Sequence, residues 1–321
     1  MPTVLEPHNI DELSEALRAA HSEGERVCSF NLCRLNRILD HAPEDMTVTA
    51  EAGLTLASLQ GTLAARGQWL PIDPPQPERK TIGAILATNA SGPRRLGYGA
   101  VRDWLIELKV VLANGSLIKS GGRVVKNVAG YDLTKLFIGS QGTLGVIVEA
   151  TFKLRPLPER EALVQHTFAR LDEAIGFVET ISESTLSPVI LDLHNIPIGH
   201  SPSAREFSVV LGLAGAREDV EDELRRAAEL GATEVPELTY EKLFWNEPTS
   251  DPVRKWSVLP SALGQSLRQL NGAAFVARAG NGIIFYRAPS PPPASPRLSG
   301  NLFQRVKDAF DPKHIFPELT A

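Results

Sequence analysis

Cysteine is scarce in this 321-residue sequence, which contains only Cys28 and Cys33. Two cysteines are too few for a disulfide framework or an iron–sulfur cluster, and their spacing matches no CxxC motif, so we expect two free thiols. No apolar run is long enough to span a bilayer, and the N-terminus lacks the basic and apolar regions of a signal peptide. We therefore expect a cytoplasmic protein that does not insert directly into a membrane.

The sequence also lacks an excess of basic residues. Its formal net charge is −5, whereas nucleic-acid binding needs a basic face, so no nucleic-acid partner is expected. Neither GxGxxG after the first predicted strand nor GxxxxGK[ST] is present, which argues against a Rossmann site and a P-loop. His194 and His200 are close enough for a metal or acid–base site, but such loop histidines are more often ordinary surface residues, and we predict no metal site. No catalytic residue is assigned, and His194 and Tyr240 are only guesses for a base.

The length favours about two domains, and 43% hydrophobic with 22% charged residues is typical of globular proteins. Asn9 and Thr55 are predicted to cap helices, and Asn114-Gly115 predicts a hairpin. The proline-containing segment 155–158 is the predicted domain boundary. We expect a first domain over residues 1–157, an α+β domain with an antiparallel sheet over 158–288, and a proline-rich spacer with a final helix over 289–321.

A glycine-rich stretch covers residues 81–149. Within it, 87–92 and 139–145 combine glycines with Ser, Thr and Asn, whose N–H and hydroxyl groups can bind a diphosphate or the edge of a flavin ring. An ordinary polar turn is an equal alternative for the first segment, and a β-bulge turn for the second. The prolines of 71–75 make a rigid segment suited to form a ligand wall. The segment 126–133 suits either a redox site or a helix N-terminus.

These segments, PIDPP, TIGAILATNASGP, GYGAVRDW and FIGSQGTLGVIVEA, resemble the vanillyl-alcohol oxidase, or PCMH-type, FAD-binding flavoproteins. More narrowly, the sequence is similar to the FAD-binding subunit of bacterial glycolate oxidase. The resemblance is specific over residues 35–158 and implies a two-subdomain FAD-binding domain followed by a smaller α+β cap domain. It implies that the following residues line a non-covalently bound FAD: Pro71, Ile72, Asp73, Pro74, Thr88, Asn89, Ala90, Ser91, Gly92, Gly97, Tyr98, Gly99, Gly142, Thr143, Gly145 and Val146.

The resemblance also implies a function. It predicts an FAD-dependent oxidoreductase subunit of a 2-hydroxy-acid dehydrogenase complex, with a second flavin subunit and an iron–sulfur subunit as partners. A small 2-hydroxy acid would be the substrate, and peripheral contact with the inner membrane would occur through the partners. An FAD oxidase that acts on a sugar or lactone remains an alternative.

The sequence departs from this family at two places. Relatives have a glycine-rich diphosphate loop after the second strand, whereas here Phe30 leads directly to Leu35 through four residues without glycine. The usual ending near the flavin is also replaced by Ile315-Phe316-Pro317-Glu318-Leu319. Because several charge-assisted hydrogen bonds to the diphosphate would be lost, FAD affinity is expected to be weakened or absent. A non-catalytic subunit that keeps the fold but has lost tight FAD binding is therefore the alternative function.

Overall fold

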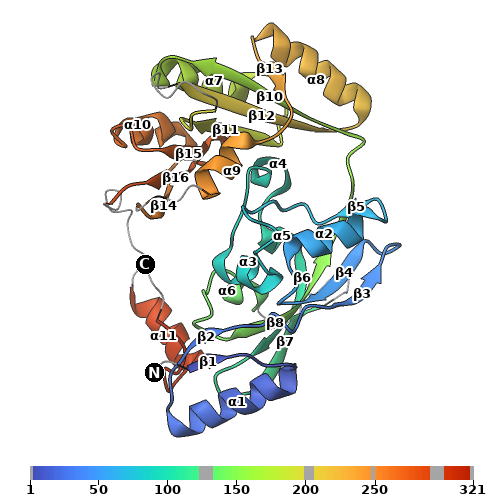
Figure 1. Ribbon diagram of the computed structural model, residues 1–321, viewed down its shortest axis with the longest axis vertical. Coiled ribbons are helices and arrows are strands. Elements are labelled where there is room, and N and C mark those ends of the chain that lie inside the picture. The colour runs from blue at the N-terminus through green and yellow to red at the C-terminus, as the bar shows by residue number, and fades with distance from the viewer. Residues whose placement is uncertain are drawn as a thin grey trace. The chain divides into compact units, whose positions relative to one another are not determined.

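The computed structural model describes residues 3–122, 133–198, 206–246, 249, 251–289 and 300–318. Of the segment 126–133, singled out from the sequence, residues 126–132 lie outside the described ranges. The chain divides into two compact units. Unit 1 comprises Met1–Ser91, Ala100–Leu157 and Leu298–Ala321, and unit 2 comprises Gly92–Gly99 and Pro158–Arg297. Both units are mixed α and β with antiparallel sheets, which confirms the predicted fold class (Figure 1).

Unit 1 begins with a β–α–β element. Strands β1 (Thr3–Leu5) and β2 (Val27–Phe30) pair in parallel, and α1 (Ile10–Glu23) connects them. As predicted, Asn9 caps α1, and its side-chain oxygen accepts the N–H of Glu12 at 2.8 Å. Leu13 and Leu17 on the buried face of α1 join a hydrophobic cluster that also contains Val148.

The main sheet of unit 1 has five strands in the order β3-β4-β8-β6-β7, all antiparallel. Its strands are β3 (Ile38–Ala42), β4 (Thr47–Glu51), β6 (Leu105–Val111), β7 (Leu117–Gly121) and β8 (Val146–Lys153). The predicted Asn114-Gly115 hairpin joins β6 to β7. Two further strands, β5 (Gln68–Trp69) and β9 (Arg155–Pro156), pair beside this sheet.

Five helices complete unit 1, and most of them bury apolar side chains in one cluster with β4, β6 and β8. They are α2 (Leu56–Ala64), α3 (Ile82–Thr88), α5 (Val101–Trp104), α6 (Thr134–Phe137) and α11 (Gly300–Phe310). Thr55 caps α2 as predicted. Helix α3, in contrast, was not predicted, because a seven-residue helix containing Gly83 is too short to show a clear helical period.

Unit 2 is built on a seven-stranded antiparallel sheet in the order β13-β10-β12-β11-β15-β16-β14. Its strands are β10 (Arg160–Phe168), β11 (Ile190–His194), β12 (Phe207–Gly215), β13 (Thr233–Val235), β14 (Val253–Ser257), β15 (Phe275–Arg278) and β16 (Ile283–Arg287). Its helices are α4 (Arg95–Tyr98), α7 (Leu171–Glu183), α8 (Arg217–Glu229), α9 (Thr239–Asn246) and α10 (Leu263–Arg268).

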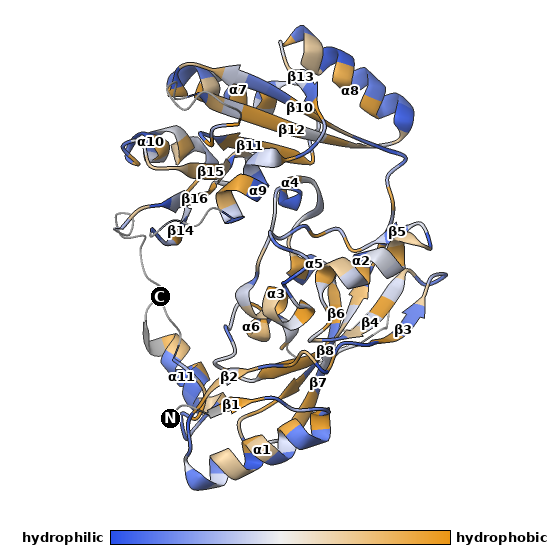
Figure 2. Cartoon of the chain, in the orientation of Figure 1, coloured by the Kyte–Doolittle hydropathy of each residue, from blue (hydrophilic) through white to orange (hydrophobic). Residues whose placement is uncertain are grey.

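Helices cover both faces of this sheet. Side chains of α7, α8 and α10 pack with Val209 and Leu211, whereas α9 packs with Val210 on the opposite face. Alternate residues of a strand point to opposite faces, so β12 separates two hydrophobic clusters. Figure 2 shows hydrophobic strands in both sheets and helices α1 and α8 with distinct hydrophilic and hydrophobic faces.

Candidate functional site

Two turns of unit 1 lie side by side. Helix α3 ends at Asn89, whose φ of 48° and ψ of 44° lie in the left-handed region. A second turn, at residues 139–142, is hydrogen-bonded to the end of α3. The N–H of Gly139 donates to the Leu86 carbonyl at 2.9 Å. The N–H of Gln141 donates to the Ala87 carbonyl at 2.8 Å. The structure therefore brings together residues from the 87–92 and 139–145 segments that the sequence singled out.

Two features of these turns are available to a ligand, the side-chain oxygen of Asn89 and the backbone at Gly142. The Asn89 side-chain oxygen is buried and has no hydrogen-bond partner among the described residues. A buried acceptor without a partner is costly, so it marks a place where a ligand N–H or a water can bind. Gly142 has a φ of 74°, and a Cβ added there would meet nothing within 4 Å. A flat ligand can approach the backbone closely at this glycine.

Other predicted residues of the second turn serve packing. A Cβ on Gly145 would lie 2.6 Å from Val110 Cγ1, so this glycine is required by the core. Val146 is buried and pairs with Val111 in the sheet. Thr143 is also buried, and its hydroxyl donates to the Ser140 carbonyl at 2.7 Å.

Near the first turn, Thr88 bonds within its own helix, where its hydroxyl donates to the Ala84 carbonyl at 2.6 Å. The N–H of Ala90 donates to Ile85, closing the helix end. Ser91 is half-buried and follows directly, as the last residue of this part of unit 1. These contacts give the first turn one conformation.

The proline segment is held by Gln60 of α2. The Gln60 amide donates to the Leu70 carbonyl at 2.6 Å and accepts the Leu70 N–H at 3.1 Å. Pro71, Ile72 and Pro74 are buried and Asp73 is half-buried. The segment is thus a fixed part of the unit 1 core, as expected of a rigid wall.

The predicted residues Gly92, Gly97, Tyr98 and Gly99 all belong to unit 2. The N–H of Gly97 donates to the Val189 carbonyl at 3.1 Å, and an added Cβ would lie 2.6 Å from Val189 Cβ. Gly97 is thus explained by close packing of α4 near β11. Gly99 has a φ of 80°, which favours glycine at the end of α4.

The segment after β2 is the place where relatives have a diphosphate loop. Here three of its backbone N–H groups are hydrogen-bonded within the chain. The N–H groups of Asn31, Cys33 and Leu35 donate to Leu5, to the Asn31 side chain and to Leu32, respectively. A Cβ on Gly53 would lie 1.8 Å from the Leu32 carbonyl oxygen, so the short segment packs tightly against the chain after β4.

A buried carboxylate of β4, Glu51, contacts the chain just after this segment, and it was not predicted from the sequence. Glu51 is 2% exposed and accepts the Arg37 N–H at 2.8 Å and its guanidinium at 2.8 Å. Burial opposes ionisation of Glu51, but the hydrogen bonds from the Arg37 side chain and backbone outweigh it and lower the pKa of this carboxyl. Because the Arg37 guanidinium is paired with this carboxylate, the pair offers no unpaired positive charge to a phosphate.

Unit 2 contains a separate buried polar cluster on the face of the sheet covered by α9. Asp192 accepts the Tyr240 hydroxyl at 2.6 Å and also pairs with Arg278. Arg278 in turn donates to Glu241 at 2.8 Å. The His194 ring stacks on Tyr240 with centroids 4.3 Å apart.

Neither guess for a base is supported by this cluster. Burial, followed by the charge of Arg278, lowers the pKa of His194 to about 3, which makes it a weak base. His194 Nδ1 accepts the Ile196 N–H at 3.2 Å, so the proton of the neutral ring is on Nε2. Burial raises the pKa of Tyr240 well above its usual value, and its hydroxyl already donates to Asp192.

The surface of the five-stranded sheet carries a cavity of about 540 Å³, lined by charged side chains. Lys109 pairs with Glu149 at 2.7 Å, and Lys119 pairs with Glu107 at 2.9 Å. Because these charges satisfy each other, the cavity offers no evident ligand site. In the described ranges there is no cluster of His, Cys, Asp and Glu that would hold a metal, and no helix has the length and apolar character needed to cross a membrane. Cys28 and Cys33 are exposed free thiols.

Comparison with known proteins identifies a domain within the first part of the chain. Residues 28–121 match a family model described as an FAD binding domain. This part of the chain is an FAD-binding domain of the PCMH type. The predicted family resemblance and the predicted cofactor, FAD, are thereby confirmed for the domain.

Relatives of the FAD-binding domain are named as oxidase subunits and dehydrogenases. Glycolate oxidase subunit GlcD of Bacillus subtilis (strain 168) is 35% identical over 213 residues, which cover 60% of this chain and 45% of that protein. Glycolate oxidase subunit GlcE of Escherichia coli (strain K12) is 37% identical over 153 residues, which cover 47% and 43%. The chain thus spans less than half the length of these relatives. A D-lactate dehydrogenase [cytochrome] of Arabidopsis thaliana is 42% identical over 148 residues, covering 46% and 26%.

The fold itself extends beyond the FAD-binding domain. The structure of an alkyldihydroxyacetonephosphate synthase matches 97% of this chain and 75% of that chain with a TM-score of 0.75 and 18% sequence identity. At this low identity the match establishes the fold alone.

The FAD-binding domain fits its cofactor unevenly. The Asn89 oxygen and the open backbone at Gly142 suit a flavin ring, which carries an N–H donor and a flat face. The segment after β2 does not suit a diphosphate, since the N–H groups named above are engaged and the nearby Arg37 guanidinium is paired with Glu51.

Proposed function

We propose that this chain is the FAD-binding subunit of a glycolate oxidase-like 2-hydroxy-acid dehydrogenase complex. The observation that carries the proposal is the convergence of the two turns around Asn89 and Gly142, within a domain of the FAD-binding family. The names of the relatives, glycolate oxidase subunits and a D-lactate dehydrogenase, support oxidation of a small 2-hydroxy acid.

In this proposal, residues 1–157 form the FAD-binding domain and 158–288 the cap domain. Thr88, Asn89, Ala90 and Ser91 border the flavin on one side, and Gly142 on the other. FAD, when bound, supplies the hydride acceptor. The protein contributes orientation, because the hydrogen bonds between the two turns fix the position of Asn89 and Gly142. The proline segment contributes a rigid wall.

The proposed partners are a second flavin subunit and an iron–sulfur subunit, which would carry electrons away from the flavin. This assignment is supported by the similarity to two different glycolate oxidase subunits. The proposed location is the cytoplasm, with peripheral attachment to the inner membrane through the partners.

A second candidate function is supported by the segment after β2. A subunit that keeps the fold for assembly but does not bind FAD tightly would need no diphosphate loop. The engaged N–H groups and the Arg37–Glu51 ion pair favour this candidate, because they leave the diphosphate with few donors.

Flavin content separates the two candidates. The purified chain would be titrated with FAD, and the flavin absorbance and fluorescence would be recorded. Saturable binding with about one FAD per chain supports the first candidate, whereas a chain that co-purifies with its partner subunits yet never binds FAD supports the second. Failure to bind FAD and failure to associate with any flavin or iron–sulfur subunit would contradict both.

A further inference from the structure

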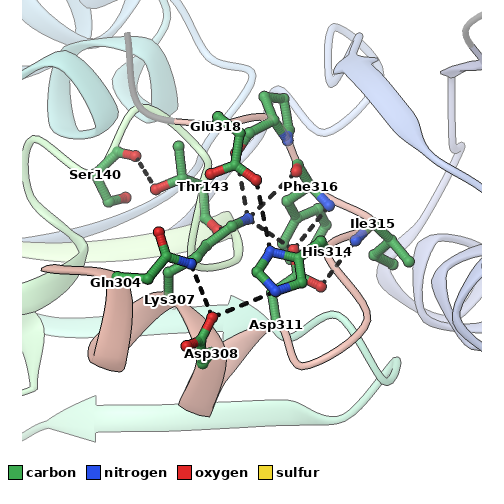
Figure 3. Close-up of polar contacts among 11 residues, drawn as sticks. Ser140, Thr143, Gln304, Lys307, Asp308, Asp311, His314, Ile315, Phe316 and Glu318 are labelled. Atoms are coloured by element: carbon green, nitrogen blue, oxygen red, sulfur yellow. Dashed lines mark hydrogen bonds and ion pairs between the residues drawn. The ribbon is translucent and has the colours of Figure 1, made fainter. Parts of the chain in front are cut away.

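A buried lysine contacts the second turn of the candidate site. Lys307 of α11 and Asp311 are both fully buried at 0% exposure. Lys307 Nζ donates to the Asp311 carboxylate at 2.7 Å and to the Thr143 carbonyl oxygen at 2.8 Å (Figure 3). Charged side chains are almost never fully buried unless their charges are paired, and Lys307 and Asp311 meet this requirement by pairing with each other.

The pair organises the C-terminal segment. Lys307 Nζ lies 3.2 Å from the carbonyl oxygens of both Phe316 and Pro317. The Asp311 carboxylate accepts the N–H groups of Ile315 and Phe316 at 3.0 and 2.9 Å. The chain after α11 is therefore folded around one ion pair, and every polar atom of that pair has a partner.

The same segment is anchored to the beginning of unit 1. The Val27 N–H of β2 donates to the Ile315 carbonyl at 2.8 Å. The rings of Phe30 and Phe316 meet edge to face with centroids 5.7 Å apart. In addition, Phe310 of α11 packs edge-on against Phe137, with centroids 5.5 Å apart. Lys307 thus projects from a helix that is fixed on several sides.

We infer that Lys307 is a positioning residue that holds the turn at residues 139–143 in the conformation required for flavin binding. Its ammonium group binds the Thr143 carbonyl, one residue after Gly142, whose open backbone faces the proposed flavin position. Without this donor the Thr143 carbonyl loses its charged partner, and the turn loses its tie to α11. The effect on the turn is independent of the proposed function, whereas the effect on flavin affinity rests on it.

The test uses the full chain with Lys307→Met, a variant that keeps the apolar stem but removes the ammonium. Because Lys307→Met leaves the Asp311 charge buried and unpaired, Lys307→Met/Asp311→Asn provides a second variant without that charge. Leu63→Ala, in the buried core of α2, is the control for a general loss of stability. Amide hydrogen exchange of Gly139 and Gln141 is measured without FAD, and FAD affinity is measured by fluorescence titration.

Both Lys307 variants are expected to exchange the Gly139 and Gln141 amides at least about tenfold faster and to bind FAD about tenfold more weakly. Leu63→Ala should lower the unfolding midpoint while changing both quantities by less than about twofold. Unchanged exchange in the two Lys307 variants would overturn the inference, as would unchanged FAD affinity in a protein whose wild type binds FAD. If the wild type binds no FAD, the first candidate function, an FAD-binding subunit, fails. The exchange rates alone then decide whether Lys307 positions the turn.

Discussion

Replacement of Gly142 by alanine tests whether FAD contacts the backbone of the second turn. An alanine at φ 74° costs roughly 1–2 kcal/mol, because left-handed backbone brings Cβ close to the following carbonyl. No steric clash adds to this cost, since a Cβ at Gly142 would meet nothing within 4 Å. Gly67 is a matched control in the same unit, with a φ of 65° and equally open surroundings. Both variants should therefore lose the same stability.

Only Gly142→Ala should weaken FAD binding. A methyl group between the backbone and a flat ligand prevents close approach, and an affinity loss of about tenfold corresponds to about 1.4 kcal/mol. Urea unfolding measures the stability of each variant, and quenching of FAD fluorescence measures its affinity. Equal FAD affinity for Gly142→Ala and Gly67→Ala, at equal loss of stability, would refute the placement of the flavin at this turn.

Three further predictions concern pH and the proline segment. Burial raises the pKa of Asp192 to about 6 from 3.8, so the folded state keeps a proton that the unfolded chain loses, and the free energy of unfolding should fall by about 2 kcal/mol as pH rises from 4 to 6. Urea titrations should show that Asp192→Asn lacks this fall, and identical pH profiles would contradict it. Burial, followed by the Arg278 charge, lowers the pKa of His194 from 6.5 to about 3. Because the unfolded chain then binds a proton that the folded state does not, the free energy of unfolding should fall as pH drops below 6.5, by about 3 kcal/mol at pH 4.5. His194→Gln should show a smaller acid loss than wild type, and an equal loss would exclude His194 as its source. Gln60→Leu leaves the buried Leu70 N–H without its partner and the Leu70 carbonyl with the Ile72 N–H alone, and it should cost about 1–3 kcal/mol in thermal or urea unfolding, whereas Thr62→Ala on the exposed side of α2 should cost much less.

Local signals in the sequence predicted local structure well. Asn9 and Thr55 cap helices because a side-chain oxygen needs only the N–H three residues later. The Asn114-Gly115 hairpin likewise depends on two adjacent residues. The strand order β3-β4-β8-β6-β7 was not predicted, because β8 pairs with β4 across about one hundred residues and nothing in either strand alone specifies this partner.

The candidate site was predicted in part. The sequence directed attention to residues 87–92 and 139–145, and the structure joins these two segments by a hydrogen bond from the Gln141 N–H to the Ala87 carbonyl. It could not predict that Gly92, Gly97, Tyr98 and Gly99 belong to unit 2, since they lie within the same glycine-rich stretch. The proposed flavin contacts of all these residues stay predictions until FAD binding is measured.

By itself, the sequence determined the caps of α1 and α2, the Asn114-Gly115 hairpin and the presence of an FAD-binding domain, because these properties depend on residue type and short spacing. The tertiary structure alone decided which glycines leave open space. A Cβ added at Gly142 would meet no protein atom within 4 Å, whereas one added at Gly97 or Gly145 would clash with Val189 or Val110, respectively. It also decided that Lys307 supports the Thr143 carbonyl from 164 residues away. Such contacts depend on what distant segments place around an atom, and no local pattern records that.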